Sequence, residues 1–229
     1  MVYKWDLHIP KLSPELSRRA YLYLPAGYDE QPDRRFPVMY MFDGHNVFFD
    51  EDATYGKSWG MARYLDETQT PLIVAAVECN SIGNNRLEEY CPFTCEDPKL
   101  GVIRGRGRAT MNWFVHEFKP MIDANIRTLS DRSNTFICGS SMGGLMSLYA
   151  ATAFNATFGK AACLSPSLWL GAGKMRRIIN QADIAPDTLI YMDYGGEEMA
   201  NHAANLSALT SCSTALLKKG VDLTFRIAP

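Results

Sequence analysis

Residues 136–146 read FICGSSMGGLM, a strand-like apolar run followed directly by a helical pattern. The pattern Gly-x-Ser-x-Gly fits this stretch only with Ser141 at its centre, because a register centred on Ser140 would need further glycines. In this motif the serine occupies a strained turn between a strand and a helix, and the flanking glycines prevent clashes between the two. The free N–H groups and the positive dipole end of the helix point toward developing negative charge. Ser141 is therefore predicted to be a nucleophile.

Apolar runs and helical patterns alternate on both sides of this motif. Runs typical of strands occupy residues 20–25, 36–43, 71–79, 134–139, 160–166, 188–195 and 221–228. Helical spacing of apolar residues occurs in residues 58–69, 110–127, 143–154, 174–182 and 199–220. Most of the strand runs are continuously apolar, as is typical of parallel strands covered on both faces. The alternation predicts one α/β domain over residues 1–229, with a mostly parallel central sheet and helices on both faces.

The composition excludes several classes of protein. The formal net charge of the 229 residues is −2, so no global charge attracts nucleic acid or an anionic membrane. No stretch approaches the roughly 20 apolar residues of a membrane helix, and the first residues show no uninterrupted apolar segment of a signal peptide. The six cysteines are predicted to be thiols. Cys91 and Cys95 form a lone C-x3-C without a second pair, so we expect no metal site. Because the sequence shows no secretory signal, we expect a cytoplasmic protein.

Residues 80–108 contain many Gly, Asn and Arg residues and show no periodicity. The segment is predicted to be a long loop, and a loop of this length in a compact domain is usually functional.

The nucleophile motif belongs to a set of sequence segments that are informative when they are taken together. GSSMGGLMSLYA (139–150), FGKAACLSPSLW (158–169), MYMFDGHNVF (39–48), RLEEYCPF (86–93) and FVHEFKPMIDANIRT (114–128) together span most of residues 20–200. This set resembles the "putative esterase" branch of the α/β-hydrolase superfamily. That branch includes enterobactin-esterase-like proteins, feruloyl and acetyl-xylan esterases, S-formylglutathione hydrolase and the mycolyltransferases. The resemblance implies the α/β-hydrolase fold and a Ser–acid–His mechanism that hydrolyses carboxylic esters without a cofactor.

The Asp43-Gly44 pair follows a predicted buried strand, and its simplest interpretation is a turn. In the resembling family, the residue after this pair donates its backbone N–H to the oxyanion hole, which implies His45 here. The second donor would be the N–H of Met142, directly after the nucleophile. Loss of one such donor typically costs about 3 kcal/mol of barrier. The imidazole of His45 is as well explained by a structural role as by a contact with substrate.

The acid of the triad is expected after the strand at 188–195, in the chain order Ser, acid, His. Three carboxylates compete for this role: Asp193, Glu197 and Glu198. Members of the resembling family often show a G-x-x-E pattern here, which favours Glu198 and leaves Asp193 as the second candidate.

The base of the expected Ser–acid–His triad is a histidine. His202 follows Glu198 by four residues and could pair with it on one helix face, whereas His8 and His116 precede the nucleophile. In the resembling family the base follows the last strand, which is predicted to end here just before Pro229. We therefore expect the base beyond Pro229, with the C-terminal end of the domain incomplete.

Two residues are candidates for substrate binding. Trp169 stands where the resembling family lines its pocket, and Trp59, Trp113 and Phe48 are candidates further out. Arg86 matches an arginine at the pocket rim of that family; the alternative is an ion pair with Glu88 or Glu89.

Three functions remain open from the sequence. The first is a serine carboxylesterase that acts on small or sugar-linked esters, of the acetyl or feruloyl type. The second is an acyltransferase with the same acyl-enzyme, and the third is a binding protein with this fold and no catalytic base. The expected partner in the first case is a small-molecule or carbohydrate-linked ester.

Overall fold

The structure of the chain is a computed structural model that describes residues 1–198 and 202–228, with the backbone alone described for His202. Its strands are β1 (Val2–Ile9), β2 (Ser13–Tyr23), β3 (Val38–Met41), β4 (Ile73–Val77), β5 (Cys95–Asp97), β6 (Gly101–Ile103), β7 (Thr135–Ser140), β8 (Lys160–Leu164), β9 (Leu189–Gly195) and β10 (Asp222–Ala228). The α-helices are α1 (Met61–Glu67), α2 (Asn85–Glu89), α3 (Gly107–Trp113), α4 (Lys119–Asn125), α5 (Met142–Ala153), α6 (Ala172–Gln181) and α7 (His202–Lys218). A π-helical segment, Phe114–Phe118, joins α3 to α4, and short 3-10 turns occupy Gly44–Asn46, Arg132–Asn134 and Leu168–Leu170.

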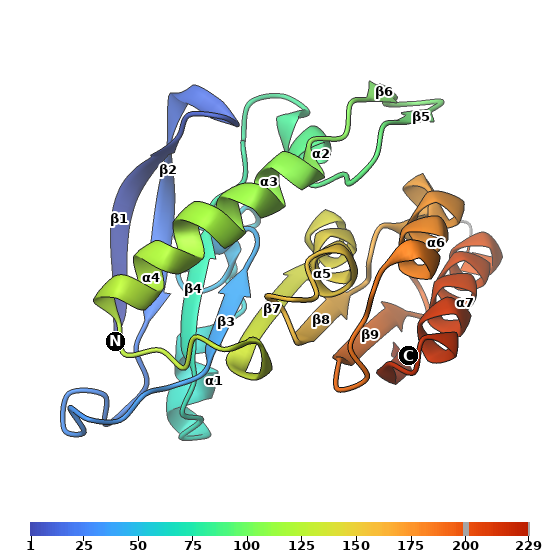
Figure 1. Ribbon diagram of the computed structural model, residues 1–229. Helices are drawn as coiled ribbons and strands as arrows, with labels where there is room; N and C mark the ends of the chain where they lie inside the picture. The colour runs from blue at the N-terminus through green and yellow to red at the C-terminus, as the bar shows by residue number, and fades with distance from the viewer. Residues whose placement is uncertain (199–201, 229) are drawn as a thin grey trace.

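The main sheet has eight strands in the order β1-β2-β4-β3-β7-β8-β9-β10 (Figure 1). The pairs from β4 through β3, β7, β8 and β9 to β10 are parallel. Strand β2 runs antiparallel to both of its neighbours, β1 and β4. The prediction of a mostly parallel α/β sheet is confirmed, and the sheet is open rather than closed into a barrel. Strand β10 is an edge strand of this sheet.

Each predicted strand has a counterpart, but β1 was missed by the sequence analysis. Its side chains alternate only weakly between exposed and half-buried, since β1 lies at the other edge of the sheet and pairs with β2 alone. Such a strand lacks the continuous apolar run that identifies the central strands.

The two faces of the sheet build two separate cores. Along β4, Ile73, Ala75 and Val77 belong to the larger core, while Val74 and Ala76 belong to the smaller one. Helices α3 to α7 contribute to the larger core, and α1 covers the smaller one (Figure 1). Because successive side chains of a strand point to opposite faces, burial on both sides requires an apolar residue at every position. This explains the continuous apolar runs of the central strands.

Residues 80–108 are more ordered than the predicted loop. They contain α2 and the β5–β6 hairpin, and buried polar contacts anchor them. The carboxylate of Glu89 is ion-paired with Arg18, and both side chains are almost completely buried. Glu89 also accepts the N–H of Asn80, while Arg106 donates to backbone carbonyls of residues 11 and 12. These partners are distant in sequence, so no local pattern reveals them.

The six cysteines are free and buried, which confirms their prediction as thiols. Cys91 and Cys95 lie with their sulfur atoms 3.9 Å apart. None of the described helices combines the length and the hydropathy that a membrane span requires.

Candidate active site

Ser141 occupies the turn between β7 and α5 with φ 58° and ψ −115°, a backbone conformation that is strained for a residue with a side chain. Its N–H donates to the carbonyl of Leu164 on the neighbouring strand β8 over 2.9 Å. The turn requires its glycines. A Cβ on Gly139 would lie 2.6 Å from the carbonyl carbon of Gly143, and one on Gly144 would lie 2.6 Å from the carbonyl oxygen of Leu164. The predicted strand–turn–helix geometry is confirmed.

The side chain of Ser141 is exposed, and its Oγ lies 3.1 Å from Oγ of Ser167. The next residue, Met142, begins α5. Its N–H belongs to the first turn, where amides have no acceptor within the helix. An anion beside Ser141 would therefore meet an N–H group and the positive end of the helix dipole.

The loop after β3 provides the second side of the site. Asp43 adopts a left-handed conformation with φ 56°, and Gly44–Asn46 form a 3-10 turn. A Cβ on Gly44 would lie 2.8 Å from the ring of Tyr21 and 2.9 Å from the amide nitrogen of Val77, so this position needs a glycine. Because β3 and β7 are parallel neighbours, the loop after β3 and Ser141 lie at the same edge of the sheet.

Ser141 lies on the walls of two cavities. The larger one, of about 660 Å³, extends toward the loops after β3 and β4 and is lined by His45, Trp59, Arg86 and other mostly polar residues. The smaller one, of about 340 Å³, extends toward the ends of β8 and β9 and is lined by Trp169 and Glu198. The hydroxyl group is therefore accessible from both sides.

Both candidate acids contact one residue, Ser165. Asp193 accepts the N–H of Ser165 over 3.0 Å, and Glu198 accepts its hydroxyl over 2.6 Å. Glu197 and Glu198 are both exposed, and Glu198 lines the smaller cavity together with Ser141, whereas Asp193 lies half-buried within β9. The preference for Glu198 over Asp193 stays a prediction.

Arg86 forms an ion pair, but its partner is neither Glu88 nor Glu89, the alternatives considered from the sequence. Its Nε and Nη2 each donate to one oxygen of Asp43 over 2.7 Å. Burial works against the charge of Arg86, but the hydrogen bonds and charge of Asp43 outweigh it and raise the pKa of the guanidinium. Arg86 also lies on the wall of the larger cavity, so its predicted contact with substrate stays a prediction.

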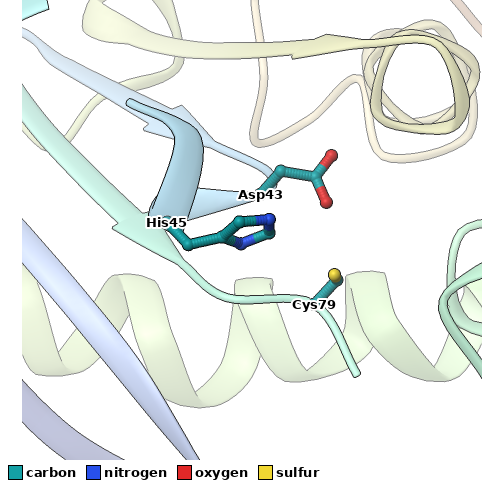
Figure 2. A group of neighbouring side chains, drawn as sticks. All are labelled: Asp43, His45 and Cys79. Atoms are coloured by element: carbon teal, nitrogen blue, oxygen red, sulfur yellow. The ribbon is translucent and has the colours of Figure 1, made fainter. Parts of the chain in front are cut away.

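Asp43, His45 and Cys79 form a compact group, with one possible metal-ligand atom from each lying within 4.8 Å of the others (Figure 2). The guanidinium of Arg86 already lies against the carboxylate of Asp43, and it would repel a second cation there. Burial and the nearby Asp43 raise the pKa of the Cys79 thiol, whereas metal binding requires a thiolate. We interpret the group as polar contacts around the ion pair.

Two of the histidines considered above, His45 and His202, bear on the site, and of these two the structure describes the side chain of His45 alone. The imidazole of His45 lines the larger cavity, with Nε2 3.1 Å from Oγ1 of Thr54. The side chain of His202 and the whole of Pro229 lie outside the described residues. Their predicted relations to Glu198 and Ser141 therefore stay predictions.

The aromatic candidates divide into two groups. Trp169 is 39% exposed in the smaller cavity, and Trp59 is 38% exposed in the larger one. Trp113 and Phe48 are buried core residues, so their candidacy for the substrate wall was wrong. Trp113 stacks on Phe118 within the larger core.

The sequence analysis missed several residues that hold the site. Ser165 and Ser167 contact the candidate triad, and the Ser-Pro-Ser sequence after β8 was the available signal. Tyr90 accepts the N–H of Asp43 through its hydroxyl, a contact between residues 47 positions apart that no local pattern indicates.

Comparisons with known proteins agree with this geometry. A family model with the description "Putative esterase" matches residues 13–221. The chain is 26% identical over 185 residues to the uncharacterized protein YbbA of Bacillus subtilis, an alignment that covers 80% of this chain and 69% of that protein.

Solved structures share the fold. An IroE-like serine hydrolase from Shewanella oneidensis superposes with a TM-score of 0.77 at 19% identity, covering 100% of this chain and 74% of that one. A ferulic acid esterase gives a TM-score of 0.66 at 16% identity, covering 100% of this chain and 90% of the other. The match of the family model over most of the chain identifies it as a member of the "Putative esterase" family, a branch of ester hydrolases within the α/β-hydrolase superfamily.

Proposed function

We propose that the protein is a serine carboxylesterase that hydrolyses small or sugar-linked carboxylic esters through an acyl-enzyme on Ser141. One observation carries the proposal: Ser141 is exposed on a strained turn at the start of α5, on the walls of both cavities. The carbonyl group of an ester can reach the Ser141 hydroxyl there, while the acyl group of the ester lies in one cavity and its alcohol group in the other.

In the proposed mechanism, Oγ of Ser141 bonds to the ester carbonyl carbon and its proton passes to a histidine base. The N–H groups of His45 and Met142 stabilise the negative oxygen of the tetrahedral intermediate. Glu198 orients the base and stabilises its charged form. The C–O bond to the alcohol then breaks, and the base returns the proton to the departing oxygen. Water hydrolyses the acyl-enzyme by the same steps.

The cavities support the proposed substrate class. The smaller one is walled by Trp169, whose exposed ring suits an acetyl or an aromatic acyl group such as feruloyl. The larger one is lined mostly by polar residues, among them Asn46, Thr54 and Asn80, and also by the exposed rings of Tyr55 and Trp59. Polar groups beside exposed aromatic rings suit the hydroxyls and apolar faces of a sugar alcohol. A structural neighbour that is a ferulic acid esterase and another that is a serine hydrolase agree with this assignment.

The test is covalent labelling with a fluorophosphonate probe. The probe should modify Ser141 of the wild-type protein and leave Ser141→Ala unlabelled, while the matched Ser140→Ala variant keeps its labelling. Turnover of p-nitrophenyl acetate should be lost only in Ser141→Ala. Labelling that maps to Ser140, or persists without Ser141, would contradict the assignment.

A second experiment distinguishes an esterase from an acyltransferase by measuring how the acyl group divides between water and an added alcohol. With excess alcohol as acceptor, an esterase releases mainly free acid, whereas a transferase yields mainly the new ester. The proposal requires free acid to dominate.

A further inference from the structure

We propose that Arg86 is a positioning residue: its bidentate ion pair with Asp43, here called the clamp, fixes the loop that carries the His45 N–H. This inference rests on the proposed function, because the N–H of His45 has a catalytic task only in the esterase mechanism. It differs from a contact between Arg86 and substrate, which the sequence analysis expected.

The geometry of the pair is specific for arginine. Nε and Nη2 of Arg86 each donate to a different oxygen of Asp43 over 2.7 Å, which fixes the carboxylate in orientation as well as position. Lysine could supply the charge but not the planar fork. The side chain of Asp43 is 8% exposed, so its charge depends on this partner rather than on water.

The loop needs such support because its backbone is strained. Asp43 adopts φ 56°, a left-handed conformation that persists only where surrounding contacts over-determine it. The hydroxyl of the buried Tyr90 accepts the N–H of Asp43 over 3.3 Å. Both the side chain and the backbone of Asp43 are therefore held by residues 86–90, which form α2 and its end.

The helix α2 is itself firmly anchored. Glu89, next to Tyr90, forms its ion pair with Arg18 of strand β2, and both charges are buried. A continuous set of contacts therefore leads from β2 through α2 to Asp43 and to the loop of residues 43–46, which carries the His45 N–H.

The carboxylate of Asp43 also lies beside the nucleophile turn. A Cβ on Gly143 would lie 3.4 Å from Oδ2 of Asp43, so the carboxylate packs against the first turn of α5, where the Met142 N–H lies. Displacement of Asp43 would alter the spacing of both proposed oxyanion donors. A misplacement of about 1 Å can lower a catalytic rate about 100-fold.

The experiment compares Arg86→Lys, Arg86→Gln and Asp43→Asn with a matched control, Arg63→Gln. Arg63 is an exposed arginine of α1 that pairs with Glu67. With p-nitrophenyl acetate as substrate, we expect kcat to fall about 100-fold in the three variants that break the Arg86–Asp43 pair, with KM changed less than about twofold. The double variant Asp43→Asn/Arg86→Gln should lose no more than the worse single variant, because both break one interaction.

Hydrogen–deuterium exchange provides a readout that needs no activity. Exchange of the amides of residues 43–46 should accelerate in the clamp variants and in Tyr90→Phe, while the amides of β8 keep the wild-type rate. If Arg86→Gln does not fold, Arg86→Lys and Tyr90→Phe still decide the question, since each removes only part of the clamp.

The outcomes are distinguishable. Unchanged exchange in residues 43–46 overturns the clamp, whatever the kinetics show. An unchanged kcat with a raised KM for a bulky ester also overturns it and assigns Arg86 to substrate binding. If the wild-type protein does not react with the fluorophosphonate probe, the proposed function fails, whereas accelerated exchange in the variants still supports the clamp.

Discussion

The hydroxyl of Ser165 donates to Oε1 of Glu198 over 2.6 Å, which ties the end of β8 to the turn after β9. Ser165 is held in a left-handed conformation with φ 43°, and its N–H donates to Asp193. Since the N–H of Ser141 donates to Leu164, the residue before Ser165, this contact places both candidate acids close to the nucleophile turn.

The first prediction separates the candidate acids. Glu198→Gln should lower kcat by about four orders of magnitude, because the amide cannot stabilise the charged base or fix its tautomer. The adjacent and exposed Glu197 provides the matched control, and Glu197→Gln should keep wild-type kinetics. Circular dichroism and thermal melting check that the variants are folded. Asp193→Asn as the more damaging change would transfer the role of the acid to Asp193.

The second prediction concerns the close packing of the nucleophile turn. Gly144→Ala should lower the free energy of unfolding by about 1–3 kcal/mol, because the new methyl group would meet the carbonyl of Leu164 at 2.6 Å. Gly173→Ala, in α6, is the matched control, since no atom lies within 4 Å of its added Cβ. That change should stabilise the protein by about 0.5–1 kcal/mol, because alanine favours the helix. Urea unfolding measures both. Equal effects of the two substitutions would show that the turn tolerates a side chain.

The third prediction concerns the buried ion pair between Arg18 and Glu89. Glu89→Gln should destabilise the protein by about 3–5 kcal/mol, because it leaves the charge of Arg18 buried without its partner. The exposed Arg63–Glu67 pair of α1 is the control, and Arg63→Gln should leave the free energy of unfolding unchanged within error. Chemical denaturation followed by fluorescence measures both variants. A loss of stability in Glu89→Gln no larger than in the control would show that solvent reaches Arg18.

The fourth prediction concerns the thiols. Burial raises the pKa of Cys138 to about 12 and that of Cys212 to about 11, so both thiols are neutral at pH 8. Since the thiolate is the reactive form, the native protein should react very slowly with Ellman's reagent. In denaturant, all six thiols should react rapidly. Rapid reaction of a thiol in the native protein would identify a segment that opens locally.

The sequence by itself determined the strand–helix alternation and the register of the nucleophile turn. Both depend on local chemistry: continuous apolar runs identify strands covered on both faces, and only glycines fit beside a strained serine. The edge strand β1 escaped prediction because it has one neighbour and a weakly alternating pattern.

Only the tertiary structure decided the partners of Arg86 and Arg18. Arg86 binds Asp43 across 43 positions of sequence, and Arg18 binds Glu89 across 71, whereas the nearest opposite charges of Arg86 in the sequence, Glu88 and Glu89, are not its partners. The order of parallel strands brings the ends of β3, β4 and β7 to one edge of the sheet, and this order is not encoded in any local periodicity. The pairing of Arg18 and Arg86 therefore follows the tertiary structure, since burial next to a specific partner depends on which distant segments become neighbours.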